Sequence, residues 1–155
     1  MTAFADTNWV IATYFIKQEE QRTALVERFA RQHGRPLIVS HIILLECRNA
    51  FAWTAREQNP LEWRDFQADL GRKFLVDTMN WDMLRQRAGE LCSRYSHKAK
   101  LGTFDLTLVS SALLTGADSF LSFDSRCRAL AAAQRLKVFP GLSAPEKELV
   151  QALRS

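Results

Sequence analysis

Two acidic residues stand where an apolar segment of the chain ends. Asp6 directly follows the run Thr2–Ala5, and Asp124 directly follows Phe120–Phe123. Each run is predicted to be a short strand, so each carboxylate is expected at the carboxyl end of a strand. A structural role is the alternative, because Asp is a strongly favoured first residue before a helix, and capping leaves one carboxylate oxygen for other contacts.

Two further acids lie inside apolar helical segments. Glu46 interrupts HIILLECRNAFAW (41–53), where an ionised carboxylate is costly unless it has a partner or binds a cation. An ion pair with Arg48 or another arginine is the alternative. Asp105 lies in the first turn of TFDLTLVSSALL, on the same side as Leu108, Val109 and Ala112, although first-turn acids are common in helices.

If these four carboxylates meet, they repel one another unless a cation lies between them. A hard divalent ion such as Mg²⁺ or Mn²⁺ prefers carboxylate oxygens to sulfur or imidazole. The chain has no HExxH or CxxC motif, and His33, His41 and His97 fall on separate predicted helices. If Asp6, Glu46, Asp105 and Asp124 meet, we therefore expect a divalent cation between them, Mg²⁺ or Mn²⁺.

Basic residues are concentrated near two of these acids. Residues 85–100 contain five basic residues and one acid, and residues 126–137 contain four basic residues and no acid. Such segments beside an acidic centre suit a polyanion such as RNA, although ordinary solvated helix faces are an equally good explanation. The candidate RNA contacts are Arg94, Lys98, Lys100, Arg126 and Arg128.

Short apolar runs alternate with longer amphipathic segments along the whole chain. Strands are expected at 2–5, 36–40, 74–78, 119–123 and 136–139, and helices at 7–17, 18–34, 41–58, 61–73, 81–98, 103–114 and 125–134. This order predicts the α/β class: a three-layer sandwich with a central parallel sheet, of Rossmann-like type. Residues 1–155 are expected to form one domain, with a core at 1–140 and a short final helix at 143–154.

The ordered set of motifs resembles the PIN domain. It consists of ADTNWVI (5–11), the isolated Glu46, TFDLTLVSSALLTGADSFLSFD (103–124) and the following SRCRALA. More narrowly, the chain resembles the VapC-type toxins of bacterial toxin–antitoxin pairs. The resemblance implies that Asp6, Glu46 and Asp105 hold a metal and that Asp124 completes the acidic cluster. It also implies supporting roles for Asn8 and for Ser122, which stands where many members have Thr.

The resemblance implies a Mg²⁺-dependent endoribonuclease that hydrolyses RNA phosphodiester bonds with a metal-activated water. It also implies an antitoxin partner and a homodimer. The family often has a further acid after the fourth one, whereas Ser125 and Arg126 follow here, which leaves a second metal position open. A non-catalytic PIN-like module that binds RNA or a protein is the alternative function.

Composition agrees with a globular protein in the cytoplasm. Of 155 residues, 47% are hydrophobic and 25% charged, with a net charge of +4. No apolar run approaches the roughly 18 residues of a membrane span. The first ten residues lack the basic start of a signal peptide. Three widely spaced cysteines argue against a disulfide framework, and they are expected to be buried thiols.

Overall fold

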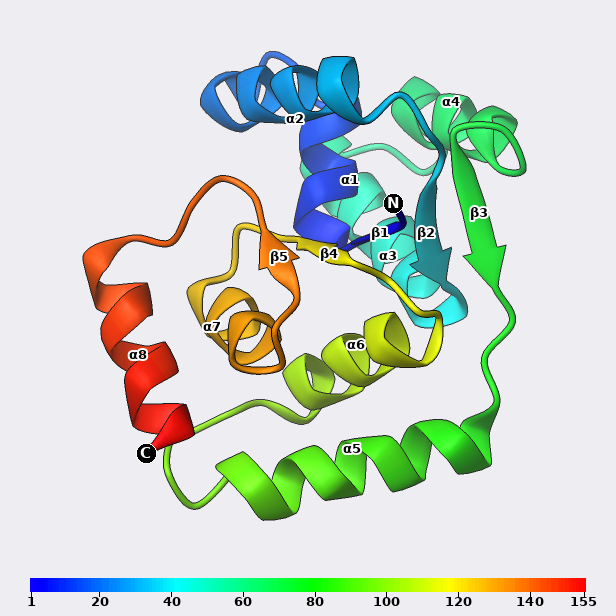
Figure 1. The fold of residues 1–155 in the computed structure, drawn as a ribbon. Helices are drawn as coiled ribbons and strands as arrows, with labels where there is room; N and C mark the ends of the chain where they lie inside the picture. Colours follow the sequence, from blue (N-terminus) through cyan, green and yellow to red (C-terminus); the bar gives the residue numbers. More distant parts are fainter. The chain divides into compact units, whose positions relative to one another are not determined.

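The computed structural model describes residues 1–155, which form five strands and eight helices (Figure 1). The strands are β1 (Ala3–Ala5), β2 (Leu37–Ser40), β3 (Phe74–Asp77), β4 (Ser119–Leu121) and β5 (Lys137–Val138). The helices are α1 (Thr7–Tyr14), α2 (Glu20–His33), α3 (His41–Ala55), α4 (Leu61–Asp69), α5 (Trp81–Tyr95), α6 (Thr103–Leu114), α7 (Ser125–Ala133) and α8 (Ala144–Arg154).

The strands form one five-stranded sheet in the order β3-β2-β1-β4-β5. The pairs β2–β3 and β4–β5 are both parallel, as expected when helices connect successive strands. The predicted α/β class with a parallel sheet is therefore confirmed. The chain packs as two compact units, Ala5–Thr78 and Met79–Ser155 together with Met1–Phe4. That the whole chain is one domain stays a prediction.

An aromatic core holds the unit Ala5–Thr78 together. Rings from α1, α3, α4 and β3 contact one another with centroid distances of 5.0 to 6.3 Å. These rings belong to Tyr14, Phe15, Phe51, Trp63, Phe66 and Phe74. The Tyr14 hydroxyl lies among these rings and donates a 2.6 Å hydrogen bond to Asp69. The core thus fixes α1 and α3, the two helices that carry Asp6 and Glu46.

The second unit is built on β4 and β5. Phe4 stacks on Phe120 with ring centroids 5.9 Å apart, and the Thr2 carbonyl accepts hydrogen bonds from the backbone of Asp118 and Ser119. Within this unit, α5 runs alongside α6, and α7 packs against α8 (Figure 1). These contacts fix the positions of α6, which carries Asp105, and of the turn into α7, which carries Asp124.

All predicted strands and helices are present, but four helices end three or four residues earlier than predicted. The first ends at Tyr14 rather than residue 17, because Phe15 leaves the helical region with φ −92° and ψ 65°. The third ends at Ala55 rather than residue 58, because Arg56 adopts the left-handed conformation with φ 56°. The fourth ends at Asp69 rather than residue 73, because Leu70 is extended and bridges to Phe74. The fifth ends at Tyr95 rather than residue 98. Amphipathic periodicity continues through these turns and does not mark where the backbone changes direction.

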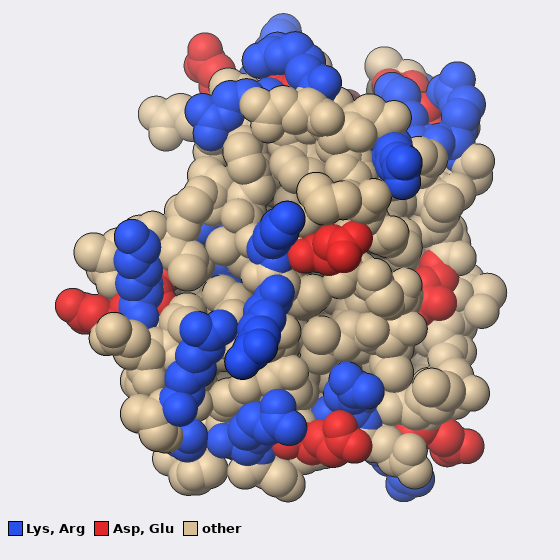
Figure 2. All heavy atoms as spheres, in the orientation of Figure 1, with Lys and Arg blue, Asp and Glu red and all other residues tan.

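Charged side chains on the face drawn in Figure 2 form several groups. Lys and Arg side chains gather in separate clusters, with Asp and Glu side chains beside some of them. The drawn face is therefore mildly basic, in agreement with the net charge of +4. None of the helices is both long and apolar enough to cross a membrane.

Candidate active site

Asp6 begins α1 and is one of the buried acids, with 6% of its surface exposed. Its Oδ1 accepts a 2.7 Å hydrogen bond from the backbone N–H of Thr7, so the carboxylate caps the helix. The Asn8 side chain donates to the other oxygen, Oδ2, at 3.5 Å. The cap and the amide both restrain the carboxylate at the end of β1.

Glu46 is linked to this turn through Thr7. The Thr7 hydroxyl donates a 3.0 Å hydrogen bond to Oε1 of Glu46, which is partly exposed on α3. Arg48, the alternative partner considered above, instead donates to the Gln58 carbonyl and lies over the ring of Trp63. Thr7 therefore joins the helix-capping acid of α1 to the acid of α3 within one unit.

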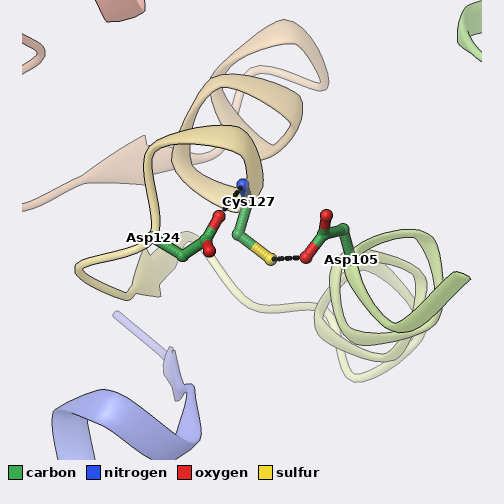
Figure 3. Close-up of side chains that lie close together, drawn as sticks. All are labelled: Asp105, Asp124 and Cys127. Atoms are coloured by element: carbon green, nitrogen blue, oxygen red, sulfur yellow. Dashed lines mark hydrogen bonds between the residues drawn. The ribbon is translucent and has the colours of Figure 1, made fainter. Parts of the chain in front are cut away.

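Asp105 and Asp124 come together in the other unit, with Cys127 beside both (Figure 3). One ligand atom from each of the three residues lies within 4.8 Å of the others. Asp105 is partly exposed, Asp124 is exposed and Cys127 is buried. The structure thus brings the four predicted acids together in two pairs, each pair within a single unit.

Hydrogen bonds hold Asp105 at the start of α6. Its Oδ1 accepts from the Cys127 thiol at 3.2 Å, and its Oδ2 accepts from the backbone N–H of Gly102 at 3.1 Å. A Cβ atom at Gly102 would lie 3.2 Å from that same Oδ2, so a side chain there would displace the carboxylate by a few tenths of an ångström. Each carboxylate oxygen has a second lone pair, which leaves Asp105 able to bind a cation.

Asp124 is the N-cap residue of α7. Its Oδ1 accepts from the backbone N–H groups of Arg126 and Cys127, each at 3.0 Å. Its own N–H donates to the hydroxyl of Ser122, which is fully buried. Ser122 thus orients the backbone at Asp124, whose side chain is exposed.

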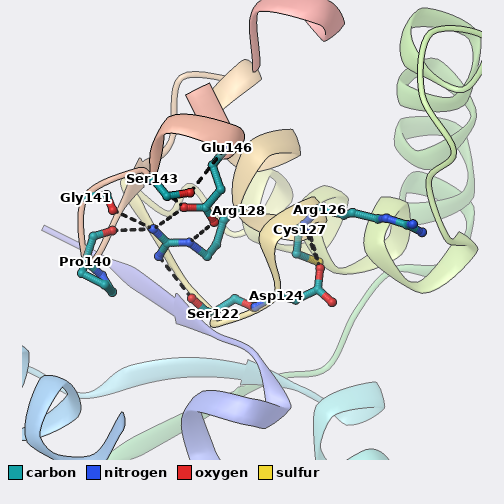
Figure 4. A network of polar contacts seen from close by, with 9 residues as sticks. All are labelled: Ser122, Asp124, Arg126, Cys127, Arg128, Pro140, Gly141, Ser143 and Glu146. Carbon is teal, nitrogen blue, oxygen red and sulfur yellow. Dashed lines mark hydrogen bonds and ion pairs between the residues drawn. The ribbon is translucent and has the colours of Figure 1, made fainter. Parts of the chain in front are cut away.

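A buried ion pair lies behind this turn and connects it to α8 (Figure 4). The Nε atom of Arg128 lies 2.7 Å from Oε2 of Glu146, and the two side chains are 4% and 7% exposed. Arg128 also donates to the carbonyl oxygens of Ser122, Pro140 and Gly141. One guanidinium therefore holds the Ser122 backbone, α7 and the segment before α8 together.

The predicted RNA contacts differ in their surroundings. Arg94, Lys98, Lys100 and Arg126 are exposed, and in Figure 4 the Arg126 side chain extends away from Asp124 and Arg128. Lys98 donates to the carbonyls of Leu153 and Ser155 at the end of α8. Arg128 is buried and bonded within the protein, so it offers no charge to a ligand at the surface.

Sequence reasoning missed the supporting roles of three residues, which are Thr7, Cys127 and Glu146. Thr7 lies inside the motif ADTNWVI, between two residues that were singled out, and Cys127 was expected to be only a buried thiol. Of the other cysteines, Cys47 is buried as predicted, whereas Cys92 is exposed. The best signal for the Arg128–Glu146 pair was the Ser143–Glu146 capping pattern, which places a glutamate in the first turn of α8.

We expect Glu146→Gln to lower the free energy of unfolding at pH 7 by about 3–5 kcal/mol, because it leaves the Arg128 charge buried without its counter-ion. Gln preserves the capping pattern with Ser143, so the loss reports on the ion pair. Urea unfolding of both proteins measures this change in the free energy of unfolding. The exposed Glu148 on the same helix provides the control, and Glu148→Gln should change stability by less than about 0.5 kcal/mol. Equal stability of the two variants would contradict the role of the pair.

The same pair predicts a pH dependence. Burial acts to raise the pKa of Glu146, but the hydrogen bonds from Arg128 and Ser143 outweigh it and hold this pKa below the usual 4.5. The stabilisation is therefore complete above pH 4.5 and is lost as pH falls through the lower pKa of the folded state. The stability difference between wild type and Glu146→Gln should shrink over that acidic range.

Comparison with known proteins assigns the chain to a family. The family model described as the PIN domain matches residues 3–133, which include all four acids and both of their supporting polar residues, Asn8 and Ser122. No curated protein matches the chain significantly. Because the family model covers most of the chain, the chain belongs to the PIN domain family, whose members are generally metal-dependent nucleases.

Proposed function

We propose that this PIN-domain protein is a Mg²⁺-dependent endoribonuclease and the toxin of a VapC-type toxin–antitoxin pair. The observation that carries the proposal is the convergence of Asp105 and Asp124, whose ligand atoms lie within 4.8 Å, in a member of a generally nucleolytic family. The catalytic residues are Asp6, Glu46, Asp105 and Asp124, supported by Asn8 and Ser122.

The donor atoms suit a hard divalent cation. Asp105 and Asp124 offer carboxylate oxygens, the ligands that Mg²⁺ and Mn²⁺ prefer. The sulfur of Cys127 is a poor ligand for Mg²⁺, and its thiol proton is used in the hydrogen bond to Asp105. We therefore assign Cys127 a positioning role, and we assign the binding of the cation to the carboxylates.

The protein's part in the reaction is to hold these carboxylates in fixed positions. Helix capping orients Asp6 and Asp124, the thiol of Cys127 orients Asp105, and the Thr7 hydroxyl orients Glu46. Because neighbouring groups already restrain the carboxylates, less free energy is needed to bring these like charges together when a ligand binds. When bound, a divalent cation neutralises charge on the phosphate and lowers the pKa of the attacking water.

RNA is the proposed substrate. The exposed basic residues Arg94, Lys100 and Arg126 belong to the same unit as Asp105 and Asp124, and Arg126 follows Asp124 by two positions. Contacts from such residues to phosphates supply affinity that is independent of sequence and weakens with salt. We include Lys98 among these contacts and leave out Arg128, because the latter is buried in its ion pair.

An antitoxin and a second copy of the chain are the proposed protein partners, in the cytoplasm. Large apolar side chains are exposed on α3, where Leu45 is 74% and Trp53 is 67% exposed, and such residues favour protein contacts. A short reading frame for an antitoxin directly upstream of the coding sequence would support the pairing. A non-catalytic PIN-like module that binds RNA or protein is the second candidate, and it would use the same basic residues.

Metal binding should stabilise the protein through Asp124. We expect saturating Mn²⁺ at about 100 times its Kd to stabilise wild type by about 2.7 kcal/mol, and Asp124→Asn to lose most of this gain. Asn is an equally good helix cap, so the variant should melt no lower than wild type in EDTA. Thermal unfolding with and without Mn²⁺ measures both effects. Asp82→Asn, at an exposed acid of α5, is the control, and equal Mn²⁺ responses in the two variants would argue against the site.

RNA cleavage tests the reaction itself. Wild type incubated with a structured RNA and Mg²⁺ should cleave the RNA. Asp6→Asn or Asp124→Asn should reduce the cleavage rate at least about 100-fold, because each variant removes a carboxylate on which metal binding is proposed to depend. Gel analysis of end-labelled RNA measures the rate, with EDTA and Asp82→Asn as controls. Equal cleavage by all proteins would indicate a contaminant. RNA binding without any cleavage by wild type would favour the non-catalytic module.

A further inference from the structure

A cavity lies at the opposite end of the strands from Asp6 and Glu46, within the unit Ala5–Thr78. Its volume is about 460 Å³, it is open to solvent on one side, and it is lined by α1, by α2 and by the segments that lead into β2 and β3. Volumes of roughly 300–1,000 Å³ are typical of small-molecule sites. Since Asp6 and Glu46 follow the carboxyl ends of β1 and β2, this cavity is separate from the carboxylates of the same unit.

The inner wall of the cavity is aromatic. Phe29 stacks on the His33 ring with centroids 5.0 Å apart and planes 24° apart, and Trp9 meets Phe29 edge to face at 5.7 Å. Val26 and Phe74 complete a lining that is mostly apolar. Burial lowers the pKa of His33, so the imidazole is uncharged at neutral pH; its ring extends the aromatic wall, and its buried Nε2 has no hydrogen-bond partner. The wall therefore suits a flat, apolar ring system.

The mouth of the cavity is basic. Arg35, Arg72 and Lys73 line it, with Glu27 as the only acid of the lining. Asp69 holds Arg72 at 2.6 Å and lies 3.6 Å from Lys73, so these two cations are fixed in place and partly neutralised. Arg35 is exposed and has no ion-pair partner within 4.0 Å. The three cations Arg35, Arg72 and Lys73 and the two acids Asp69 and Glu27 thus leave a net charge of one positive unit at the mouth.

We propose that this cavity binds a planar aromatic anion, with its ring against Phe29 and His33 and its carboxylate or phosphate beside Arg35. An aromatic wall next to a mouth with a net charge of one positive unit matches a ligand that has one apolar face and one negative charge. The few polar groups of the inner wall disfavour a ligand rich in hydrogen-bonding groups, since these would be buried without partners. The proposal is independent of nuclease activity, because it concerns other residues and a binding equilibrium.

Titration calorimetry with 2-naphthoate and 2-naphthyl phosphate tests the proposal and distinguishes the two anions. We expect 1:1 binding of at least one of them to wild type and weaker binding of the neutral 2-naphthamide. Ala30→Trp places a large ring into the cavity from an exposed position of α2 and should abolish binding. Arg35→Gln should weaken binding of the anion roughly threefold, as expected for an exposed charge pair. Arg31→Gln removes a charge from the same helix outside the cavity and should leave the affinity unchanged.

Amide chemical shifts of the same complexes locate the ligand. Shifts confined to α2, α1 and the segments that lead into β2 and β3 are expected, and circular dichroism should show that every variant is folded. The proposal is wrong if neither anion binds wild type, if Ala30→Trp binds as well as wild type, or if the shifts fall elsewhere. Equal affinities for 2-naphthoate and 2-naphthamide would also overturn it, because the charge would then play no part.

Discussion

The repulsion between two carboxylates, Asp105 and Asp124, is the constraint on which the proposed function depends. At separations of 4 to 5 Å, two unit charges in water repel by about 1 kcal/mol, and by several times more where solvent is partly excluded. Short-range hydrogen bonds hold both groups in this arrangement. Gly102 and Cys127 donate to Asp105, and the first turn of α7 donates to Asp124. A structure that keeps such a pair together is well suited to a cation.

The support for these acids extends well beyond the residues that touch them. Ser122 binds the backbone of Asp124 through its hydroxyl, and the carbonyl of the same serine accepts from Arg128. Arg128 is in turn paired with Glu146, so the C-terminal helix α8 is bonded to the turn that presents Asp124. In the other unit, the aromatic core fixes α1 and α3, and Thr7 bridges Asp6 and Glu46. Each pair of acids thus has its own rigid support.

Periodicity and capping rules predicted the fold and the capping positions of two of the acids, because both depend on residues close together in the sequence. Asp6 and Asp124 are N-caps in the structure, as the local pattern allowed. What the sequence could not predict depends on partners far along the chain. Arg128 was expected on the surface as an RNA contact, but Glu146 gives it a buried partner 18 positions away. The cavity beside Trp9 and His33 depends likewise on how α1, α2 and two strand starts pack.

Paramagnetic broadening by Mn²⁺ tests the central claim most directly, because it locates the ion rather than its effect. In amide spectra of the whole protein with substoichiometric Mn²⁺, signals of Asp105, Asp124 and Cys127 should broaden first, and excess Mg²⁺ should restore them. Broadening spread evenly over exposed acids such as Glu57 and Glu90, with no preference for the Asp105 and Asp124 turn, would contradict the account.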